Sequence, residues 1–539
     1  MNLKHLLMAG FAGLIALGAG GPIRAAEASR PNFLVILADD MGFSDAGCYG
    51  GEIQTPNLDR LAEGGLRFTQ FYNTARCWPT RSTLMTGYYA QQIRMDPPKG
   101  RLPAWARLLP HYLKPLGYRC YHSGKWHVPG APKAVADGGF DRSYVLEDHD
   151  RNFYPRKHSE DDQPLPPVAT NSGYYTATAF ADHAIRCLKE HAEQRPNQPL
   201  LTYLAFTTPH FPLHAPPEDI ARYRDRYLAG WDVAREQRWQ RQRTMGLVNC
   251  ALSARDPDMV PHWNLKEEEL RRRLGPGEAG RAVAWSELSE EQKRFQATKM
   301  AIHAAMIDRM DREIGRVLEQ VKAMGAFENT VIFFASDNGA SAEQIIRGDQ
   351  HDPQAPPGSG ATFLCLGPGW STAANTPFRL HKSWVHEGGI ATPLIVHWPK
   401  GIRARGELRH DMGHVIDFVP TLLELAGAAW TNTWNGVTAP PLPGRSLAPA
   451  FARDGAVSRD FLFFNHENNH ALRVGDWKLA ATRDNTNEWF LYDLSRDRCE
   501  MDNLASKHPE RVRQMSAQWF ELEAAFRRQA GPAEQPQGK

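Results

Sequence analysis

With 539 residues, the chain is long for one domain and can bury a large core, so two packed subdomains are the default expectation. Its 63 lysine and arginine residues nearly balance its 61 aspartate and glutamate residues, which leaves a formal net charge of +2. This balance and the lack of a basic block argue against a nucleic-acid partner, so an anionic ligand has to be held by local charge.

The N-terminus has the features of an export signal. Lys4 precedes an apolar stretch over residues 6–17, and Ala26-Glu27-Ala28 fits a cleavage pattern. We therefore expect residues 1–28 to be a signal peptide and the mature protein to be periplasmic or secreted; a buried N-terminal helix is the alternative. The stretch is too short to span a bilayer and no later segment is long enough, so we expect no membrane anchor in the mature chain.

Short apolar runs alternate with helical stretches through most of the chain. We expect a helix over 58–63 and strands over 33–38, 118–122, 200–207 and 331–335. From Met300 to Met324, apolar residues recur at helical spacing until Gly325, which predicts a helix with a core-facing stripe. This alternation predicts an α/β fold with a large mixed, mostly parallel sheet sandwiched by helices.

Residues 221–295 are rich in arginine, glutamate and tryptophan and have the character of an insertion. Glutamates 267–269 precede arginines 271–273 at distances that allow ion pairs along a helix. The composition favours a solvated face, and a position at the rim of a binding site is the alternative.

The pattern changes after Gly401. We expect a helix over 415–426, a Pro/Gly-rich link to Pro443, antiparallel strands over 461–464, 471–480 and 489–494, and a last helix over 509–528. The predicted organisation is an N-terminal domain over 29–440, a smaller C-terminal α+β subdomain with an antiparallel sheet over 441–530, and a disordered tail over 531–539.

The seven cysteines show no paired spacing, so we predict neither a disulfide framework nor a zinc C-x-x-C site. One of them lies in the segment 77–87, Cys-Trp-Pro-Thr-Arg-Ser-Thr-Leu-Met-Thr-Gly, which contains the pattern C-x-P-x-R. Pro79 suits the first turn of a helix, residues 82–86 continue it and Gly87 ends it. Cys77 is then expected at a helix N-terminus, which favours an anion, with Arg81 one turn on. The alternative is a structural cysteine beside an ordinary turn.

Acidic and amide side chains follow two of the predicted strands. Asp39 and Asp40 follow the first strand, and Asp337 and Asn338 follow the strand over 331–335. The carboxyl ends of strands in an open α/β sheet gather ligands, so these residues are expected to converge. Four oxygen donors suit Ca²⁺ or Mg²⁺ and disfavour zinc. Each pair alone is also typical of an ordinary loop or turn.

Four basic residues also follow predicted strands or lie in a loop rich in glycine and proline. Lys125 and His127 lie in Gly-Lys-Trp-His after the strand over 118–122, and they share a face if the chain stays extended. His210 lies in Thr-Pro-His after the strand over 200–207, and Lys382 lies in a loop ahead of Glu-Gly-Gly. These positions favour an active site over a core histidine or a solvated lysine.

In their order along the chain, from about Pro31 to Asn503, these motifs resemble those of the type I sulfatases, and in particular the bacterial arylsulfatase-like members of the alkaline phosphatase superfamily. Two residues depart from the pattern. Trp78 replaces the Ser or Ala that many members carry, and Thr80 replaces a Ser. The resemblance implies that a formylglycine-generating or equivalent maturase oxidises Cys77 to formylglycine. It also implies one cation, Ca²⁺ in preference to Mg²⁺, on Asp39, Asp40, Asp337 and Asn338.

The resemblance implies hydrolysis of sulfate esters with release of inorganic sulfate. One hydroxyl of the hydrated formylglycine attacks sulfur, and collapse of the other later expels sulfate. The roles it assigns are charge neutralisation by Arg81, anion binding by Lys125, acceptance of the attacking proton by Asp337, assistance to the leaving oxygen by His210 and Lys382, and deprotonation of the second hydroxyl by His127.

Two other functions are compatible with these residues. A phosphomonoester or phosphonate hydrolase of the same superfamily handles the same tetrahedral anionic geometry, and a sulfoglycan-binding protein results if Cys77 is unmodified. The expected substrate is a sulfated sugar or an aryl sulfate. The segments expected to form its rim are 151–158, 210–226, 347–351 and 466–470, whose Arg, His and Tyr content suits a sulfated sugar.

Overall fold

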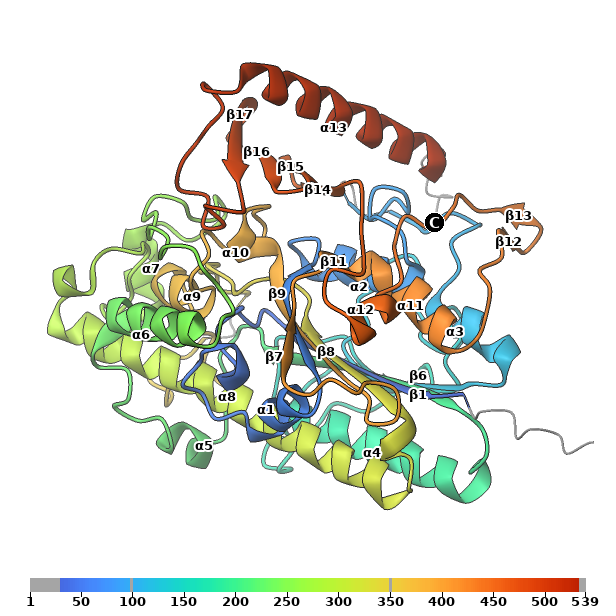
Figure 1. Ribbon diagram of the computed structural model, residues 1–539. Helices are drawn as coiled ribbons and strands as arrows, with labels where there is room; N and C mark the ends of the chain where they lie inside the picture. The colour runs from blue at the N-terminus through green and yellow to red at the C-terminus, as the bar shows by residue number, and fades with distance from the viewer. Residues whose placement is uncertain (1–29, 97–99, 349–350, 533–539) are drawn as a thin grey trace, which may run out of the picture.

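The computed structural model describes residues 30–96, 100–348 and 351–532, which form a large mixed sheet and a smaller antiparallel one (Figure 1). The predicted signal peptide and most of the predicted tail lie outside the described residues. Within them, the central four strands of the large sheet lie in the order β8 (Thr330–Ser336), β1 (Asn32–Asp39), β7 (Leu200–Pro209) and β3 (Arg119–Gly124). These four strands run parallel to one another, because β1 pairs with β7 and β8, and β3 with β7.

The outer strands make the sheet mixed. On one side of the central four lie β9 (Ala391–His397), β2 (Leu66–Tyr72), β10 (Glu407–Arg409) and β11 (Gly413–His414), and on the other β4 (Arg142–Leu146), β5 (His158–Glu160) and β6 (Gln163–Pro164). β9 is antiparallel to both β8 and β2, whereas β10, β11 and β4 pair in parallel. The predicted mixed, mostly parallel sheet is confirmed.

The two faces of the sheet are covered by different helices. Leu34 and Ile36 of β1 pack in the same core as α1 (Pro56–Glu63), α4 (Thr176–Gln194) and α8 (Glu290–Ala323). Phe33 and Val35, which point the other way, share a core with α2 (Cys77–Thr86), α3 (Leu109–Leu113), α11 (Phe418–Leu425) and α12 (Ala448–Ala452). Figure 1 shows α4 and α8 side by side below the sheet. The helical sandwich is thus as expected.

Helix α8 carries the predicted apolar stripe. Met300, Met306 and Met310 are fully buried in the core, which confirms the packing role expected from their spacing. The helix begins at a capping box in which the Ser289 hydroxyl accepts from the Gln292 N–H at 3.2 Å.

The expectation of a solvated insertion is wrong for α6 (Gly230–Thr244). Trp231 is buried, and the buried Arg238 guanidinium lies 2.8 Å from carboxylate oxygens of both Asp45 and Glu52. These acids lie almost two hundred residues earlier in the chain, so local composition does not reveal the pairing. The prediction holds for α7 (Glu267–Leu274), where exposed Arg271 and Glu267 pair at 2.6 Å.

The C-terminal sheet has the order β14 (Leu462–His466), β15 (Asn469–Val474), β16 (Trp477–Thr482) and β17 (Asn485–Asp493), with α13 (Pro509–Ala530) lying along it (Figure 1). The single strand predicted over 471–480 is wrong, because Gly475, with φ of +58°, turns the chain between β15 and β16. The helix predicted over 415–426 begins as a 3-10 turn and becomes α11 at Phe418. The antiparallel subdomain itself is confirmed.

All seven cysteines are buried free thiols, and the Sγ atoms of Cys250 and Cys499 lie 2.9 Å apart. This contact joins the segment after α6 to the loop after β17, and the spacing of the cysteines does not indicate it. Among the described helices, none combines the length and the apolar character needed to cross a membrane.

Candidate active site

The predicted site residues gather at one edge of the large sheet. Asp39 is the last residue of β1, Asp337 directly follows β8, Lys125 directly follows β3, and His210 directly follows β7. Because these four strands are parallel neighbours, their carboxyl ends meet at the same edge. The expected convergence is therefore seen, and all four side chains are buried.

Helix α2 delivers Cys77 and Arg81 to this edge. Cys77 is its first residue, so the helix includes the whole C-x-P-x-R pattern, and the predicted position of Cys77 at a helix N-terminus is confirmed. Gly87 ends it with φ of +79° and donates its N–H to the Thr83 carbonyl at 2.8 Å. Arg81 is fully buried, and its Nε donates to Asp337 Oδ2 at 2.8 Å.

Three cations neutralise the acidic cluster. Besides Arg81, Lys125 Nζ donates to Asp39 Oδ2 at 2.6 Å, and Lys382 Nζ lies 2.8 Å from Asp40 Oδ1. The Asn338 amide donates to the same Asp40 oxygen at 2.6 Å. The four residues predicted as metal ligands are thus in one cluster, surrounded by the residues predicted to bind an anion.

The donor set of this cluster fits a hard divalent cation. Asp39 Oδ1 and Asn338 Oδ1 are buried and have no hydrogen-bond partner, so both are available as ligands. Possible ligand atoms of Asp39, Asp40 and His210 lie within 4.8 Å of one another, which adds a nitrogen donor to the predicted oxygens. Asp337 is less free, because its Oδ2 accepts from Arg81 and its Oδ1 from the Asp40 N–H at 3.3 Å.

The pKa values of the three carboxyls reflect their crowding. Burial, reinforced by the charge of Asp39, raises the pKa of Asp337 to about 7. Burial also raises the pKa of Asp40, against the opposing effect of Lys382. Burial acts in the same direction on Asp39, but Lys125 and Arg81 hold its pKa below the usual value. A cation bound here would favour the ionised form of all three.

His210 is buried at the site and faces the acidic cluster. Burial, together with the charges of Lys382 and Lys125, lowers the pKa of His210 well below its usual value, so the ring is neutral. Its Nδ1 donates to the Phe211 carbonyl, which leaves Nε2 facing Asp40 Oδ2 at 3.8 Å.

The condition for Lys125 and His127 to share a face, an extended chain, is not met. β3 ends at Gly124, and His127 has φ of +49°, so the chain turns. The turn places the His127 ring 6.2 Å from the ring of Trp78, the neighbour of Cys77. His127 therefore reaches the site through a turn and not through strand alternation.

Sequence reasoning missed three residues at the site. Glu343 lies 3.2 Å from both Lys382 and Arg76, and the His149 ring is 5.4 Å from that of His210. Arg76 directly precedes Cys77, and His149 lies just before the predicted rim segment 151–158. These positions in the sequence are the only features that point to the two residues. No local pattern points to Glu343, which is revealed only by the fold.

Residues of three predicted rim segments lie near the site. The Arg347 guanidinium is 5.7 Å from the Phe211 ring and pairs with Asp150, and the His466 ring is 5.6 Å from that of Trp78. A role for the fourth segment, 151–158, stays a prediction.

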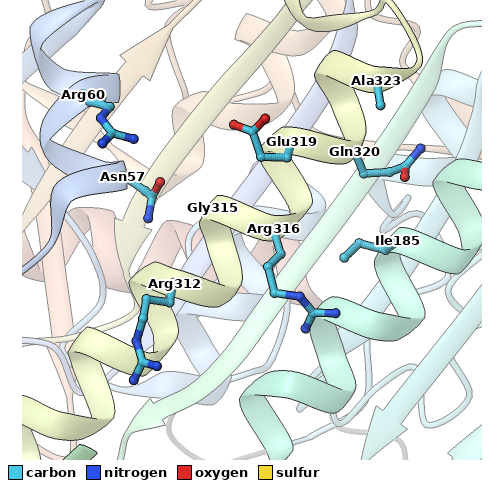
Figure 2. A pocket seen from close by; sticks show the side chains of 9 residues that line it. All are labelled: Asn57, Arg60, Ile185, Arg312, Gly315, Arg316, Glu319, Gln320 and Ala323. Carbon is cyan, nitrogen blue, oxygen red and sulfur yellow. The ribbon is translucent and has the colours of Figure 1, made fainter.

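A separate pocket of about 640 Å³ lies between α1, α4 and α8 (Figure 2), and none of the predicted site residues lines it. Its Arg312 Nε donates to Asp308 at 3.0 Å, and Arg316 pairs with Asp182 at 2.6 Å. Because neighbouring acids already neutralise these arginines, we assign the chemistry to the sheet edge.

Two family models match this chain. The family described as Sulfatase matches residues 31–428, and the one described as N-sulphoglucosamine sulphohydrolase, C-terminal, matches residues 378–524. An uncharacterized sulfatase of Schizosaccharomyces pombe is 32% identical over 93% of this chain and 95% of its own length. An arylsulfatase of Klebsiella aerogenes is 32% identical over 79% of this chain and 92% of its own. A solved structure in complex with its substrate D-glucosamine-2-N,6-O-disulfate is 20% identical, with a TM-score of 0.63 over 94% of this chain and 100% of its own.

Proposed function

Since the chain belongs to the sulfatase family and is a sulfuric ester hydrolase, we propose that it releases inorganic sulfate from sulfated carbohydrates by means of formylglycine and one bound Ca²⁺. Family members generally use a metal ion and formylglycine. The observation that carries the proposal is the buried cluster of Arg81, Lys125 and Lys382 around oxygen ligands, next to a cysteine in a C-x-P-x-R helix start.

Cys77 is the proposed modification site. Its conversion to formylglycine by a formylglycine-generating or equivalent maturase gives an aldehyde, whose hydrate offers one hydroxyl to attack sulfur and a second to release sulfate afterwards. As the first residue of α2, it lies where free backbone N–H groups favour an anionic substrate.

The cation proposed for Asp39, Asp40, Asp337 and Asn338 would polarise the sulfuryl oxygens and lower the pKa of the nucleophile when bound. Arg81 adds a fixed positive charge. Its guanidinium is held by Asp337 and by the Lys125 carbonyl at 2.9 Å, so little reorganisation is needed when charge develops. Asp337 accepts the proton of the attacking hydroxyl in this proposal.

Lys382 and His210 are proposed to assist the leaving oxygen, Lys382 directly and His210 after its Nε2 takes up a proton, because the neutral ring carries its proton on Nδ1. Although burial opposes it, the charges of Asp40 and Glu343 raise the pKa of Lys382, which keeps the ammonium protonated. Lys125 holds the sulfate anion, and His127 removes the proton from the second hydroxyl, which releases sulfate.

We further propose an exported enzyme, with residues 1–28 as signal peptide, 29–440 as catalytic domain and 441–530 as the C-terminal subdomain. The similarity to a structure that binds a sulfated glucosamine supports a sugar substrate. A phosphomonoester or phosphonate hydrolase is the rival function. The ratio of kcat/KM for matched sulfate and phosphate esters tests the choice: the sulfate ester should be preferred, and a preference for phosphate would refute the proposal.

A further inference from the structure

A polar pocket of about 540 Å³ is lined by the side chains of His262, Trp263, Glu467, Asn468, Arg483 and Asp484. Two of these residues come from the insertion. The other four belong to the turn between β14 and β15 and to the turn between β16 and β17. The pocket therefore lies where the insertion meets the C-terminal sheet.

One carboxylate joins this pocket to the active site. Glu343 accepts from Trp263 Nε1 at 2.9 Å, and its other oxygen lies 3.2 Å from Lys382 Nζ. Arg76, the residue before Cys77, also pairs with Glu343, and its guanidinium lies 5.4 Å from the Trp263 ring. This small network thus connects a residue that lines the pocket to Lys382, the residue proposed to assist the leaving oxygen.

Arg483 has hydrogen-bonding capacity that the protein does not use. Its side chain is only 10% exposed, and its Nε and Nη2 are buried without a hydrogen-bond partner. Its Nη1 pairs with Glu467 at 3.0 Å, and the guanidinium lies 5.0 Å from the Trp263 ring. Leaving buried charged donors unmatched is costly, so these atoms are suited to acceptors on a ligand.

From these contacts, and resting on the function proposed above, we infer that this pocket binds a hydroxyl-bearing sugar ring on the leaving side of the scissile sulfate ester. Arg483 and Asn468 supply donors, and Glu467 and Asp484 supply acceptors. A sugar hydroxyl both donates and accepts, so a sugar ring matches this mixed set. An aryl leaving group would leave the same polar atoms unpaired, which favours sugar sulfates over aryl sulfates as substrates.

The test compares kcat/KM for the best substrate in a panel of sulfated sugars with kcat/KM for 4-nitrophenyl sulfate. Removing a hydrogen bond to a charged group costs about a factor of 10 to 100. Arg483→Gln should therefore lower the ratio of sugar to aryl activity at least about tenfold, mainly through KM of the sugar. Arg513→Gln is the matched control, because Arg513 pairs with Glu510 on exposed α13 and should leave both activities unchanged.

A ratio that stays constant in Arg483→Gln would overturn the inference, because equal losses on both substrates indicate a structural role. Glu467→Gln, at a residue whose side chain is 32% exposed, repeats the test if Arg483→Gln does not fold, and it must shift the ratio in the same direction. Wild-type enzyme that turns over 4-nitrophenyl sulfate but no sugar sulfate would also refute the sugar pocket. Wild-type enzyme that turns over neither sugar sulfates nor 4-nitrophenyl sulfate would instead refute the proposed function.

Discussion

Replacing Lys382 by alanine tests the proposed assistance to the leaving group. The ammonium lies 2.8 Å from Asp40 and 3.2 Å from Glu343, and all three side chains are buried. Removing one partner of a buried ion pair costs about 3–5 kcal/mol, since an uncompensated charge is left. We therefore expect Lys382→Ala to lower both stability and activity, and the design must separate the two effects.

The double variant Lys382→Ala/Glu343→Gln makes this separation. It also removes the Glu343 carboxylate, which keeps Arg76 as a cationic partner in Lys382→Ala, so the double variant should differ from the single variant in its free energy of unfolding while both lack the ammonium. General acid assistance contributes about 10²–10⁴-fold to the rate. We expect both variants to lose kcat within this range on sugar sulfates, and to lose less on 4-nitrophenyl sulfate, whose leaving group needs no proton.

The assay is a plot of log kcat/KM against leaving-group pKa, with unfolding midpoints in urea recorded for each protein. A steeper slope in both variants than in wild type supports the assignment. Parallel lines, or recovery of activity in proportion to stability in the double variant, would refute the role of Lys382.

Four further outcomes follow from the same geometry. Asp40→Ala should reduce the calcium content found by elemental analysis to well below one per chain, and stoichiometric zinc in the wild-type enzyme would contradict the oxygen-rich site. His127→Ala should release about one equivalent of alcohol and then stall in a single-turnover experiment, and steady turnover would show that another group is the base. His210→Ala should show no such burst and should be rescued better by activated aryl sulfates than by sugar sulfates, with equal impairment on both as the contrary result. Arg238→Leu, which removes the buried cation between Asp45 and Glu52, should destabilise the fold by about 3–5 kcal/mol in urea unfolding, whereas a change below about 1 kcal/mol would show that His303 and Arg241 suffice to neutralise these acids.

The elements that local pattern dictates are predictable from the sequence. β1 is a short apolar run that ends in Asp39, and β8 is one that Asp337 directly follows. Because parallel strands share a carboxyl edge, the pattern alone predicts that Asp39 and Asp337 lie together. The stripe on α8 is equally clear from its spacing.

Other features depend on contacts that no local pattern contains. β2 (LRFTQFY) lacks strict alternation and β9 (ATPLIVH) contains a proline, so local pattern predicts neither strand, yet they pair with each other in the sheet. Glu343 gains its position only when its loop meets Lys382, and the turn at Gly475 divides a run that is otherwise strand-like.

The mass of the peptide containing Cys77, taken from active, purified enzyme, tests whether formylglycine is the nucleophile. If Cys77, the first residue of α2, is converted, the peptide should be lighter than encoded, with sulfur lost and oxygen gained, and the converted fraction should rise in proportion to specific activity across preparations. Fully active enzyme that carries only unmodified Cys77 would contradict the formylglycine mechanism.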